Sequence, residues 1–423
     1  MMFNSAAKIR HLATVVAAGG VIALVAATAS ASSSAPPSSI AASSLPPASV
    51  ANGYTFLDRM MDRYASGSTP RLVQSYVPDA ALGDFTDSVT YDDALVIHAL
   101  LARGTADDLR RARIIGNALL YVQANDASHD GRIRAAYSPE PLTDSRHVQP
   151  TDAISDVGNM AWVGQALVQL YAKTGDKAYL TGATGIAEWI QDEAYDTRGP
   201  GGYDGGYDGD TKILWKSTEH NLDVYAFFTM LAKETGSASW TTAAGHARSF
   251  VTAMWDAEGR KFWVGTDEGG AKPDKGFLPE DVNTWAYLAL RDATYAASID
   301  WDVSNLAARD GSVSGVSFGA CDRSKVWLEG TAHLADALAI RNAAGDTAKA
   351  QGYLSSIQLA QTTAPHHDGY GIVAASHDGL SDCDGDHYYA ALHTGATAWY
   401  LMATRAANPF ELLPTAPSPL WSP

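Results

Sequence analysis

The sequence predicts an all-α fold in which helical hairpins close into a ring. Apolar residues recur at helical spacing along most of the chain, short Gly-containing turns join neighbouring helices, and acidic residues begin alternate helices. A repeating unit of this length is typical of stacked or ring-shaped architectures. An open α-solenoid is the alternative, but the uniform period and the capping repeats that it needs are missing.

Twelve helices are expected, arranged as six hairpins. They cover residues 52–65, 92–104, 106–125, 156–174, 177–195, 219–235, 238–256, 281–297, 298–309, 327–344, 346–360 and 388–407. Residues 156–174 are apolar on nearly every side, which favours an inner ring, whereas the charged start of residues 106–125 favours a solvent-facing helix. Longer Gly- and aromatic-rich segments with short β-like runs connect the hairpins, so we expect them at one face of the ring.

Acidic residues stand where six of the helical patterns begin. They are Asp92, Asp156, Glu219, Asp281, Glu329 and Asp386, at intervals of 64, 63, 62, 48 and 57 residues. In a closed ring these carboxylates would meet around one mouth, and paired carboxylates in a shared cleft are the groups that cleave glycosidic bonds. Helix capping is the structural alternative, at about 0.3–2 kcal/mol for each residue. Capping accounts for Asp92, Asp156 and Asp281, because Asp is a favoured N-cap residue.

Glu219 exceeds what capping requires. Ser217 or Thr218 already supplies the cap of this helix, and Glu is not a preferred N-cap residue. Trp215, His220 and Asn221 lie in the same turn, and their side chains can stack on a sugar or form hydrogen bonds with it. We therefore predict a catalytic role for Glu219 and substrate contacts for these three neighbours.

Glu329 is the second predicted catalytic glutamate. It follows Trp327 and Leu328, and apolar neighbours are expected to raise its pKa, as a general acid requires. Trp327 is predicted to contact the substrate. The alternative is a first-turn glutamate that pairs with Arg323 or Lys325.

Further site residues are predicted on the neighbouring turns. Either Asp92 or Asp93 can face the cavity as a base or a binding group, since adjacent helical positions diverge by about 100°. Asp281, next to Glu280, carries the same ambiguity.

Three more side chains are weaker candidates for substrate contact. Tyr203 and Tyr207 belong to a Gly-Tyr-Asp-rich loop that could present them to a sugar, although such repeats also simply make turns. His393 is either a core histidine or a substrate contact. The His and Cys residues lack metal-ligand spacing, so we predict neither a metal nor a cofactor.

The N-terminal segment predicts an exported protein. Residues 1–31 have basic residues, an apolar run and a small-residue cleavage pattern, which indicates a secretory signal peptide; a retained membrane anchor is the alternative. Residues 32–50 are a Ser-, Ala- and Pro-rich linker, residues 51–410 the folded domain, and residues 411–423 an irregular tail. We expect a secreted monomer with no stable membrane insertion once the signal is removed.

Charge and cysteine content restrict the partners and the compartment. The net charge of −17 argues against nucleic acid and anionic lipid surfaces as partners. In an oxidising compartment Cys321 and Cys383 are expected to form a disulfide, and two free buried thiols are the alternative.

Several motifs resemble those of the six-hairpin, (α/α)6-barrel glycosidase superfamily, in a secreted bacterial branch. They are Lys216-Ser217-Thr218-Glu219-His220-Asn221, Val326-Trp327-Leu328-Glu329-Gly330-Thr331, Thr397-Ala398-Trp399-Tyr400 and Asn408-Pro409-Phe410. The resemblance covers nearly the whole folded region. It implies carbohydrate chemistry more firmly than any one reaction, because this superfamily includes glycoside hydrolases and some polysaccharide lyases.

The sequence thus predicts a glycoside hydrolase that acts on a poly- or oligosaccharide, with inversion at the anomeric carbon. Glu219 or Glu329 would donate the proton, and another carboxylate, with Asp92 as a candidate, would activate water. One alternative is a polysaccharide lyase, in which His220 or a tyrosine removes a proton next to a uronate that Asn221 or an arginine neutralises. The other is a carbohydrate-binding protein without catalysis.

Overall fold

The computed structural model describes residues 47–140, 142, 150–416 and 418–421. The predicted signal peptide, residues 1–31, and most of the predicted linker lie outside the described residues. The first helix begins at Pro47, inside the segment that we expected to be linker. Within the described part of the chain, no helix is long and apolar enough to cross a membrane.

The described residues form twelve α-helices, as the apolar spacing predicts. The helices are α2 (Pro47–Met61), α3 (Thr90–Arg103), α4 (Ala106–Ala124), α5 (Val157–Thr174), α6 (Lys177–Glu193), α7 (Thr218–Thr235), α8 (Ala238–Ala253), α9 (Asp281–Leu290), α10 (Ala297–Asn305), α11 (Leu328–Arg341), α12 (Asp346–Thr363) and α13 (Thr394–Ala403). A 3-10 turn, Ala293–Tyr295, precedes α10. The left-handed Gly104, Gly175 and Gly236 end α3, α5 and α7 and start the short turns that join each to its neighbour.

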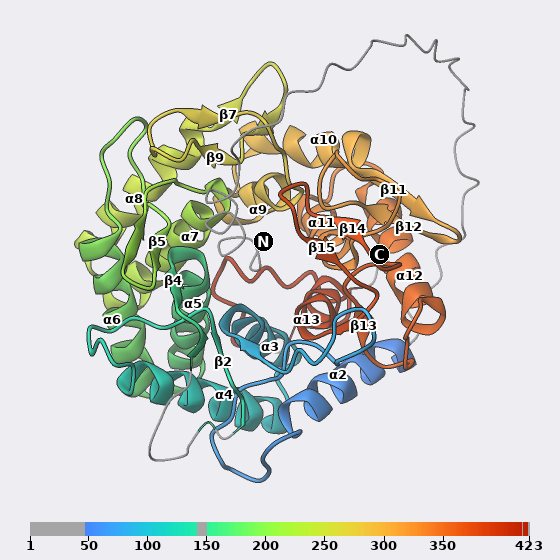
Figure 1. Cartoon of the computed structure of the whole chain (residues 1–423), viewed down its shortest axis with the longest axis horizontal. Helices are drawn as coiled ribbons and strands as arrows, with labels where there is room; N and C mark the ends of the chain where they lie inside the picture. Colours follow the sequence, from blue (N-terminus) through green and yellow to red (C-terminus); the bar gives the residue numbers. More distant parts are fainter. Residues whose placement is uncertain (1–46, 141, 143–149, 417, 422–423) are drawn as a thin grey trace, which may run out of the picture.

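Alternate helices form a closed inner ring. Helices α3, α5, α7, α9, α11 and α13 contact one another in that order, and α13 contacts α3. The other six helices lie outside them, each packed on its hairpin neighbour, with α2 on α13 (Figure 1). The predicted closed toroid is therefore confirmed, and the open solenoid is excluded because the last inner helix meets the first.

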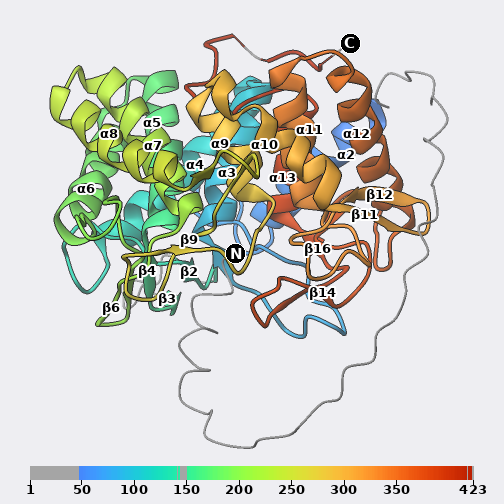
Figure 2. The same cartoon turned by 90° about the horizontal axis from the view of Figure 1, so that it is seen from above.

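Short strands gather at the end of the ring where the inner helices begin (Figure 2). The strands are β1 (Ser88–Val89), β2 (Ala136–Tyr137), β3 (Pro150–Asp152), β4 (Ile154–Asp156), β5 (Gly206–Asp208), β6 (Thr211–Ile213), β7 (Trp255–Asp256), β8 (Lys261–Phe262), β9 (Gly265–Thr266), β10 (Pro273–Asp274), β11 (Ala307–Asp310), β12 (Val313–Val316), β13 (Ile372–Val373), β14 (Leu380–Ser381), β15 (His387–Tyr388) and β16 (Leu392–His393). They pair antiparallel as two three-stranded sheets, β1-β2-β3 and β4-β5-β6, and five two-stranded ribbons. The segments that connect the hairpins thus form one face, as predicted.

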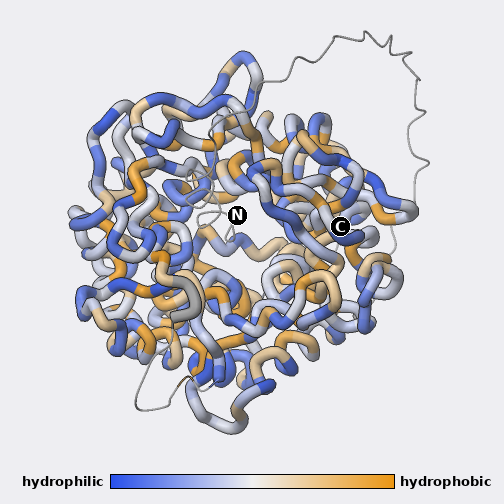
Figure 3. The backbone as a smooth tube through the Cα atoms, in the orientation of Figure 1, coloured by the Kyte–Doolittle hydropathy of each residue, from blue (hydrophilic) through white to orange (hydrophobic). Residues whose placement is uncertain are grey.

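Aromatic side chains fill the axis of the ring. Trp162, Trp285, Trp399 and Phe410 pack with ring centroids 5.1–5.9 Å apart for five of their pairs. These residues come from α5, α9, α13 and the segment after α13, so they join distant parts of the chain. The hydrophobic segments follow the helices, and hydrophilic segments are frequent on the peripheral loops (Figure 3). The centre of the barrel is a packed core, not an open channel.

The predicted helix over residues 388–407 is wrong in its first six residues. Residues 387–388 and 392–393 form β15 and β16, which pair with β14 and β13, and α13 begins only at Thr394. Asp386 lies in the turn between β14 and β15, so it does not start a helix. The physical reason is tertiary pairing, because this segment makes its backbone hydrogen bonds with other strands and not within a helix. Helical spacing of apolar residues cannot identify those partner strands.

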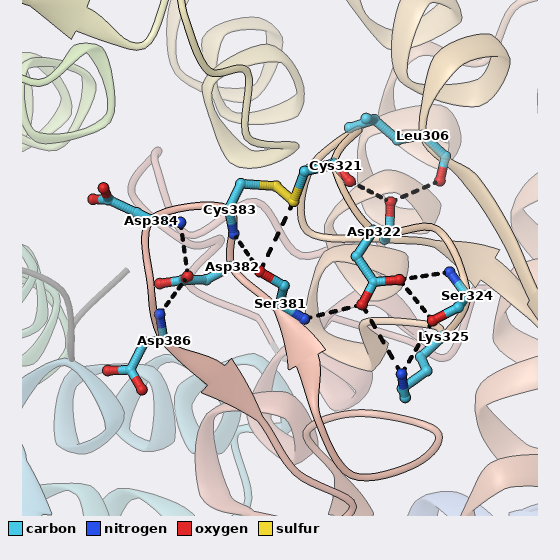
Figure 4. The surroundings of a disulfide bond; sticks show 12 residues. Leu306, Cys321, Asp322, Ser324, Lys325, Ser381, Asp382, Cys383, Asp384 and Asp386 are labelled. Carbon is cyan, nitrogen blue, oxygen red and sulfur yellow. Dashed lines mark hydrogen bonds and ion pairs between the residues drawn. A yellow bond between two sulfur atoms is a disulfide. The ribbon is translucent and has the colours of Figure 1, made fainter. Parts of the chain in front are cut away.

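The predicted disulfide is confirmed. Cys321, in the segment before α11, is bonded to Cys383, in the turn of the β14–β15 hairpin (Figure 4). Hydrogen bonds support this junction: the Ser381 amide donates to the carboxylate of Asp322 over 3.1 Å. The amides of Asp384 and Asp386 donate to Asp382 Oδ1 over 2.9 Å each, which closes the turn. The bridge fixes the hairpin against the loop that leads to α11.

Candidate active site

A pocket of about 470 Å³ opens where the inner helices begin. Its lining residues are Tyr76, Val89, Tyr91, Asp92, Glu219, Asp281, Trp285, Trp327, Glu329, His333, Tyr388 and His393. Four of them are carboxylic acids, and none is a lysine or an arginine. The pocket lining therefore combines carboxylic acids with aromatic side chains.

The first turns of four inner helices supply the carboxylic acids. Asp92 is the third residue of α3, Asp281 the first of α9, and Glu219 and Glu329 the second of α7 and α11. Because these helices begin at the same end of a closed ring, their first turns converge on its axis. The expected gathering of carboxylates around one mouth is correct for these four residues.

Adjacent acids point in different directions, as helical geometry requires. Asp93 turns away from the pocket, where its carboxylate accepts hydrogen bonds from the Val73 amide and the Ser88 hydroxyl, each over 2.8 Å. Asp92 faces the pocket. In the same way Asp281 faces the pocket, whereas Glu280 lies behind it against His333. The structure thus resolves both ambiguities of the sequence.

Hydrogen bonds and imidazoles surround Glu329. The Tyr91 hydroxyl donates to Glu329 Oε1 over 2.8 Å, and the Trp399 indole donates to that hydroxyl over 2.7 Å. His393 Nδ1 lies 3.4 Å from Glu329 Oε2, and His333 Nε2 lies 3.8 Å from Oε1. Burial alone would raise the pKa of Glu329, but the contacts with His333 and His393 lower it below its usual value.

This environment contradicts the expectation that Glu329 has a raised pKa. Its immediate sequence neighbours are indeed apolar, but His333, one turn further along α11, and His393, at the start of α13, reverse the effect of desolvation. The alternative pairing with Arg323 or Lys325 is also wrong. The partners of Glu329 are Tyr91, His333 and His393.

Glu219 has the opposite environment. It is 7% exposed, and its Oε2 has no hydrogen-bond partner among the described residues. Burial, followed by the like charges of Asp281 and Asp156, raises the pKa of Glu219 well above its usual value. Burial also raises the pKa of Asp281 to about 6. The α7–α9 side of the pocket therefore favours a protonated Glu219 at neutral pH.

His393 bridges the other two acids and stacks on an aromatic ring. Its Nε2 lies 3.4 Å from Asp92 Oδ2, and its ring is parallel to that of Tyr76, with centroids 4.1 Å apart. Burial would lower the pKa of His393, but the charge of Asp92 and its hydrogen bond raise it. His393 is the N-cap residue of α13, where its ring accepts from the Ala396 amide. The histidine is thus part of the pocket and not of the interior of a helix.

Five residues predicted to contact substrate do not line the pocket: His220, Asn221, Tyr203, Tyr207 and Trp215. Asn221 and Tyr203 are buried and bind each other, since Asn221 Oδ1 accepts from the Tyr203 amide over 2.8 Å and its Nδ2 donates to the Tyr203 carbonyl over 3.0 Å. Tyr207 donates to Glu193 over 3.0 Å on the outer side of β5. The Asn221 side chain, the Tyr203 backbone and the Tyr207 hydroxyl are thus engaged in hydrogen bonds within the protein.

His220 and Trp215 lie beside the pocket. The His220 ring packs 5.7 Å from that of Trp215, and its Nε2 is 3.9 Å from Asp156 Oδ1. Asp156 caps α5 by accepting from the Asn159 amide over 2.8 Å, as the capping interpretation expects. Asp92 and Asp281 do not cap their helices, so the same interpretation is wrong for them.

Several lining residues were missed as site residues, among them Tyr76, Tyr91, Trp285, His333 and Tyr388. Tyr76 lies in the segment before α3 and Tyr388 in β15, and the position of neither over the mouth has a periodic signal in the sequence. Trp285 follows Asp281 by four residues, so helical spacing could have indicated it, whereas Tyr91 is adjacent to Asp92 and helical spacing does not indicate it. His333 lies four residues after Glu329 on the same face of α11, which is a usable signal.

Within the described residues, no group of three or more His, Cys, Asp and Glu side chains is arranged to hold a metal ion. The lining also contains no basic residue other than the two histidines. A bound carboxylate or phosphate would meet like charge here.

No protein-family model matches the sequence, and no curated protein matches it. Solved structures do match the fold. A cellobiose 2-epimerase from Bacillus thermoamylovorans B4167 superposes with a TM-score of 0.62 at 11% identity, over 84% of this chain and 97% of that one. A glycosidase in complex with glucose gives a TM-score of 0.58 at 16% identity, over 88% and 100% of the two chains. A D-mannose isomerase gives 0.61 at 12% identity, over 84% and 94%.

The fold is a six-hairpin (α/α)6 barrel. At these identities the likeness shows the fold alone, and it confirms the architecture that the motifs implied. The (α/α)6 barrels that resemble this chain include enzymes described as a glycosidase, an epimerase and an isomerase. The choice of reaction for this chain therefore depends on its own pocket.

Proposed function

We propose that this (α/α)6 barrel is a glycoside hydrolase in which Glu219 is the general acid and Glu329 the general base. One observation carries the proposal: two glutamates share one pocket and have opposite pKa shifts. The pKa of Glu219 is raised by burial, whereas that of Glu329 is lowered by its histidine neighbours. Carboxyl pairs whose environments separate their pKa values are the acid and base of many glycosidases.

In the proposed reaction Glu219 donates its proton to the glycosidic oxygen as the bond from that oxygen to the anomeric carbon breaks. Glu329 accepts a proton from a water molecule whose oxygen bonds to the anomeric carbon from the opposite face. The products are two shorter sugars, and the proton on Glu329 returns to Glu219 through solvent. Inversion by this route requires roughly 6.5–9.5 Å between the carboxyl groups. The anomer released first, followed by proton NMR, tests the stereochemistry.

Neutral or amino sugars fit the pocket best. A uronate would bring a further carboxylate among Asp92, Asp281 and Glu329, and no lysine or arginine lines the pocket to neutralise it. This charge distribution argues against the alternative of a polysaccharide lyase, which needs a cation or an amide at the uronate. It also leaves Asn221 without that role, because its amide is bonded to Tyr203.

Single substitutions test the assignment. Labelled hexasaccharides of glucose, mannose and glucosamine serve as substrates, and product chromatography gives the rate. We expect Glu219→Gln and Glu329→Gln each to lower kcat at least about a hundredfold, the usual contribution of a general acid or base. Asp156→Asn is the matched control, because Asn also caps a helix. Full activity of both glutamine variants would overturn the proposal, and absence of product from the wild type on every sugar would favour a binding protein without catalysis.

A second candidate is a sugar epimerase or isomerase, and one observation favours it. His393 lies between Asp92 and Glu329 at 3.4 Å from each, and an imidazole in such a position can remove a proton next to a sugar carbonyl. In D2O such an enzyme would exchange the C2 hydrogen of the open-chain sugar for deuterium. Incubation with cellobiose, glucose or mannose, followed by mass spectrometry, separates this reaction from hydrolysis, which leaves C2 unlabelled.

The disulfide also supports export, which remains a proposal. Bonds of this kind persist in oxidising compartments, and Cys321–Cys383 is formed in the structure. Detection of the processed protein in culture medium would test it.

A further inference from the structure

We infer that Glu280 and His333 are positioning residues that hold an N–H donor against Glu329 and thereby keep it a proton acceptor. This inference rests on the proposed role of Glu329 as the base. Neither residue was predicted as part of the site from the sequence. Glu280 lies behind the pocket wall, just before α9, whereas His333, on α11, is part of the lining.

The three side chains contact one another in succession, from Glu280 through His333 to Glu329. Glu280 is the residue before α9, and its Oε2 lies 3.0 Å from His333 Nδ1. The other ring nitrogen of His333, Nε2, lies 3.8 Å from Glu329 Oε1, which is ion-pair distance and not hydrogen-bond distance, and it has no hydrogen-bond partner among the described residues. Glu280 and His333 are both 0% exposed, and Glu329 is 4% exposed. The chain runs from a fully buried carboxyl, through an imidazole, to a carboxylate at the pocket surface.

When Glu280 and His333 hold two protons between them, the proton between Glu280 Oε2 and His333 Nδ1 can occupy two positions, and both have the same effect on Glu329. If the proton is on Nδ1, the ring is an imidazolium beside a carboxylate, and Nε2 also carries a proton. If the proton is on Glu280, this acid donates to Nδ1, and the neutral ring must carry its own proton on Nε2. In either state Nε2–H faces Glu329. A lone pair on Nε2 would face Glu329 only if the pair lost one proton, which leaves an ionised Glu280 beside a neutral ring with its proton on Nδ1. Full burial of both side chains opposes that net negative charge.

Aromatic rings fix the plane of the imidazole. The His333 ring lies 4.3 Å from Trp399, 5.2 Å from Trp285 and 5.2 Å from Trp327, measured between centroids. These three rings come from α13, α9 and the residue before α11. They leave the imidazole little freedom to rotate, and they exclude water from its contact with Glu280. A donor in such a low-dielectric position acts strongly on a neighbouring charge.

Other charged and titratable groups act on the same carboxylate and do not replace this donor. Tyr91 of α3 donates to Glu329 Oε1, and His393 approaches Oε2 while it also faces Asp92. Asp281 and Glu219 face the pocket from α9 and α7. Behind the wall, Asp302 of α10 is the further acid that acts on Glu280. In the part of the chain that the structure describes, the two carboxyl groups within ion-pair distance of His333 are those of Glu280 and Glu329.

The inference is tested by substitutions that distinguish the loss of the N–H donor from the loss of side-chain volume. His333→Phe removes the N–H donor and keeps an aromatic ring among the three surrounding tryptophans. Glu280→Ala removes the carboxyl group that contacts Nδ1 of His333. Glu280→Gln is the conservative variant, because its amide can donate to Nδ1 and keep the proton on Nε2. Asp336→Asn is the matched control: Asp336 is a fully buried acid on α11, seven residues after Glu329.

The readout is the titration of Glu329 itself, which needs no substrate. Protein labelled with carbon-13 at the glutamate carboxyl is followed by NMR against pH, and Glu329→Gln assigns the signal. Loss of the donor destabilises the carboxylate, so the midpoint should rise by about one unit or more in His333→Phe and Glu280→Ala. Glu280→Gln should return it to within about half a unit of the wild type, and Asp336→Asn should leave it unchanged.

Outcomes for the two proposals are distinct. An unchanged Glu329 midpoint in both His333→Phe and Glu280→Ala overturns the inference, whether or not sugars are cleaved. If His333→Phe does not fold, Glu280→Ala and Glu280→Gln decide alone. A shifted midpoint in a protein that hydrolyses no sugar supports the positioning role and rejects the proposed hydrolase. If hydrolysis occurs, the acid limb of its pH profile should move with the NMR midpoint.

Discussion

At the scale of single residues, the site depends on the contrast between two glutamates at equivalent positions of α7 and α11. Each is the second residue of its helix, so the two occupy equivalent positions relative to the helix start. Their neighbours differ: acids surround Glu219, and histidines and a tyrosine surround Glu329. Position in the repeat explains why the residues meet, and local partners explain how they differ chemically.

This contrast predicts a bell-shaped pH profile of kcat/KM. The acid limb reports Glu329, whose pKa is lowered, and the alkaline limb reports Glu219, whose pKa is raised by burial and then by Asp281. Asp281→Asn removes that like charge, so the alkaline limb should move to lower pH. Asp156→Asn should move it less, because Asp156 contributes less to the shift. A profile whose alkaline limb does not respond to Asp281→Asn would contradict the assignment of Glu219.

At the scale of elements, the start of α13 packs closely on the first turn of α3. A Cβ at Gly395, the second residue of α13, would lie 2.5 Å from Asp92 Oδ1 and 2.9 Å from the His393 ring. The absence of a side chain there lets Asp92 reach His393. The Thr-Gly pair at the helix start is thus a structural requirement of the site.

Gly395→Ala should therefore displace Asp92 and lower activity by about tenfold or more, since small misplacements of catalytic groups are costly. Gly352→Ala is the control: this exposed glycine of α12 has open space around its Cβ position, and alanine there should stabilise the helix by about 0.5–1 kcal/mol. Hydrolysis rates and thermal unfolding of the two variants make the comparison. Equal activity in both would mean that Asp92 has no role.

The disulfide holds the β14–β15 hairpin, which carries Tyr388 into the pocket lining. Tyr388 packs on Phe318 and Trp327, with centroids 5.5 and 5.7 Å away. The wall of the pocket thus depends on a hairpin that has few helical contacts of its own.

Replacing both cysteines, Cys321→Ser with Cys383→Ser, should lower the free energy of unfolding by up to about 4 kcal/mol, because the bridge closes a span of 62 residues. The looser Tyr388 wall should raise KM more than it lowers kcat. Urea unfolding and steady-state kinetics measure both effects, and reduced wild-type protein should behave like the double variant. An unchanged KM would show that the hairpin keeps its place without the bridge.

At the scale of the whole molecule, closing the ring buries acids well below the pocket. Asp336 on α11 and Asp223 on α7 are 0% and 1% exposed, and their carboxyl oxygens accept no hydrogen bond from the described residues. Burial raises the pKa of Asp336 to about 8. Such groups are neutral in the stable fold, and ionising them costs stability.

The molecule should consequently be more stable at pH 5 than at pH 8. A raised folded-state pKa gives a contribution that is complete below the unfolded value near 3.8 and is lost as pH rises toward about 8. For Asp336 the loss is at most about 1.4 kcal/mol for each pH unit in that window. Asp336→Asn should flatten this decline in thermal unfolding experiments. Asp107→Asn, on an exposed acid with a lowered pKa, should not. Equal slopes for wild type and Asp336→Asn would contradict the prediction.

Much of the architecture could be predicted, because helical spacing and Gly-containing turns are local signals. The helix ends were less certain where strands compete, as at residues 388–393. For the site, the periodic acids identified Asp92, Glu219, Asp281 and Glu329 as residues of one mouth. Asn221 and Tyr203, which were also predicted to contact substrate, do not line the pocket, because each is hydrogen-bonded to the other within the fold.

The sequence by itself determined the helical hairpins, the end of the ring at which carboxylates gather, and the disulfide partners. These follow from local spacing and from the number of cysteines. Only the tertiary structure decided which glutamate has the raised pKa, because that depends on burial and on His333, His393 and Asp281. His333 is on the same helix as Glu329, but His393 is 64 residues from Glu329 and Asp281 is 62 residues from Glu219. A carboxyl group's pKa depends on charges and burial within a few ångströms, and folding brings these distant segments within that range.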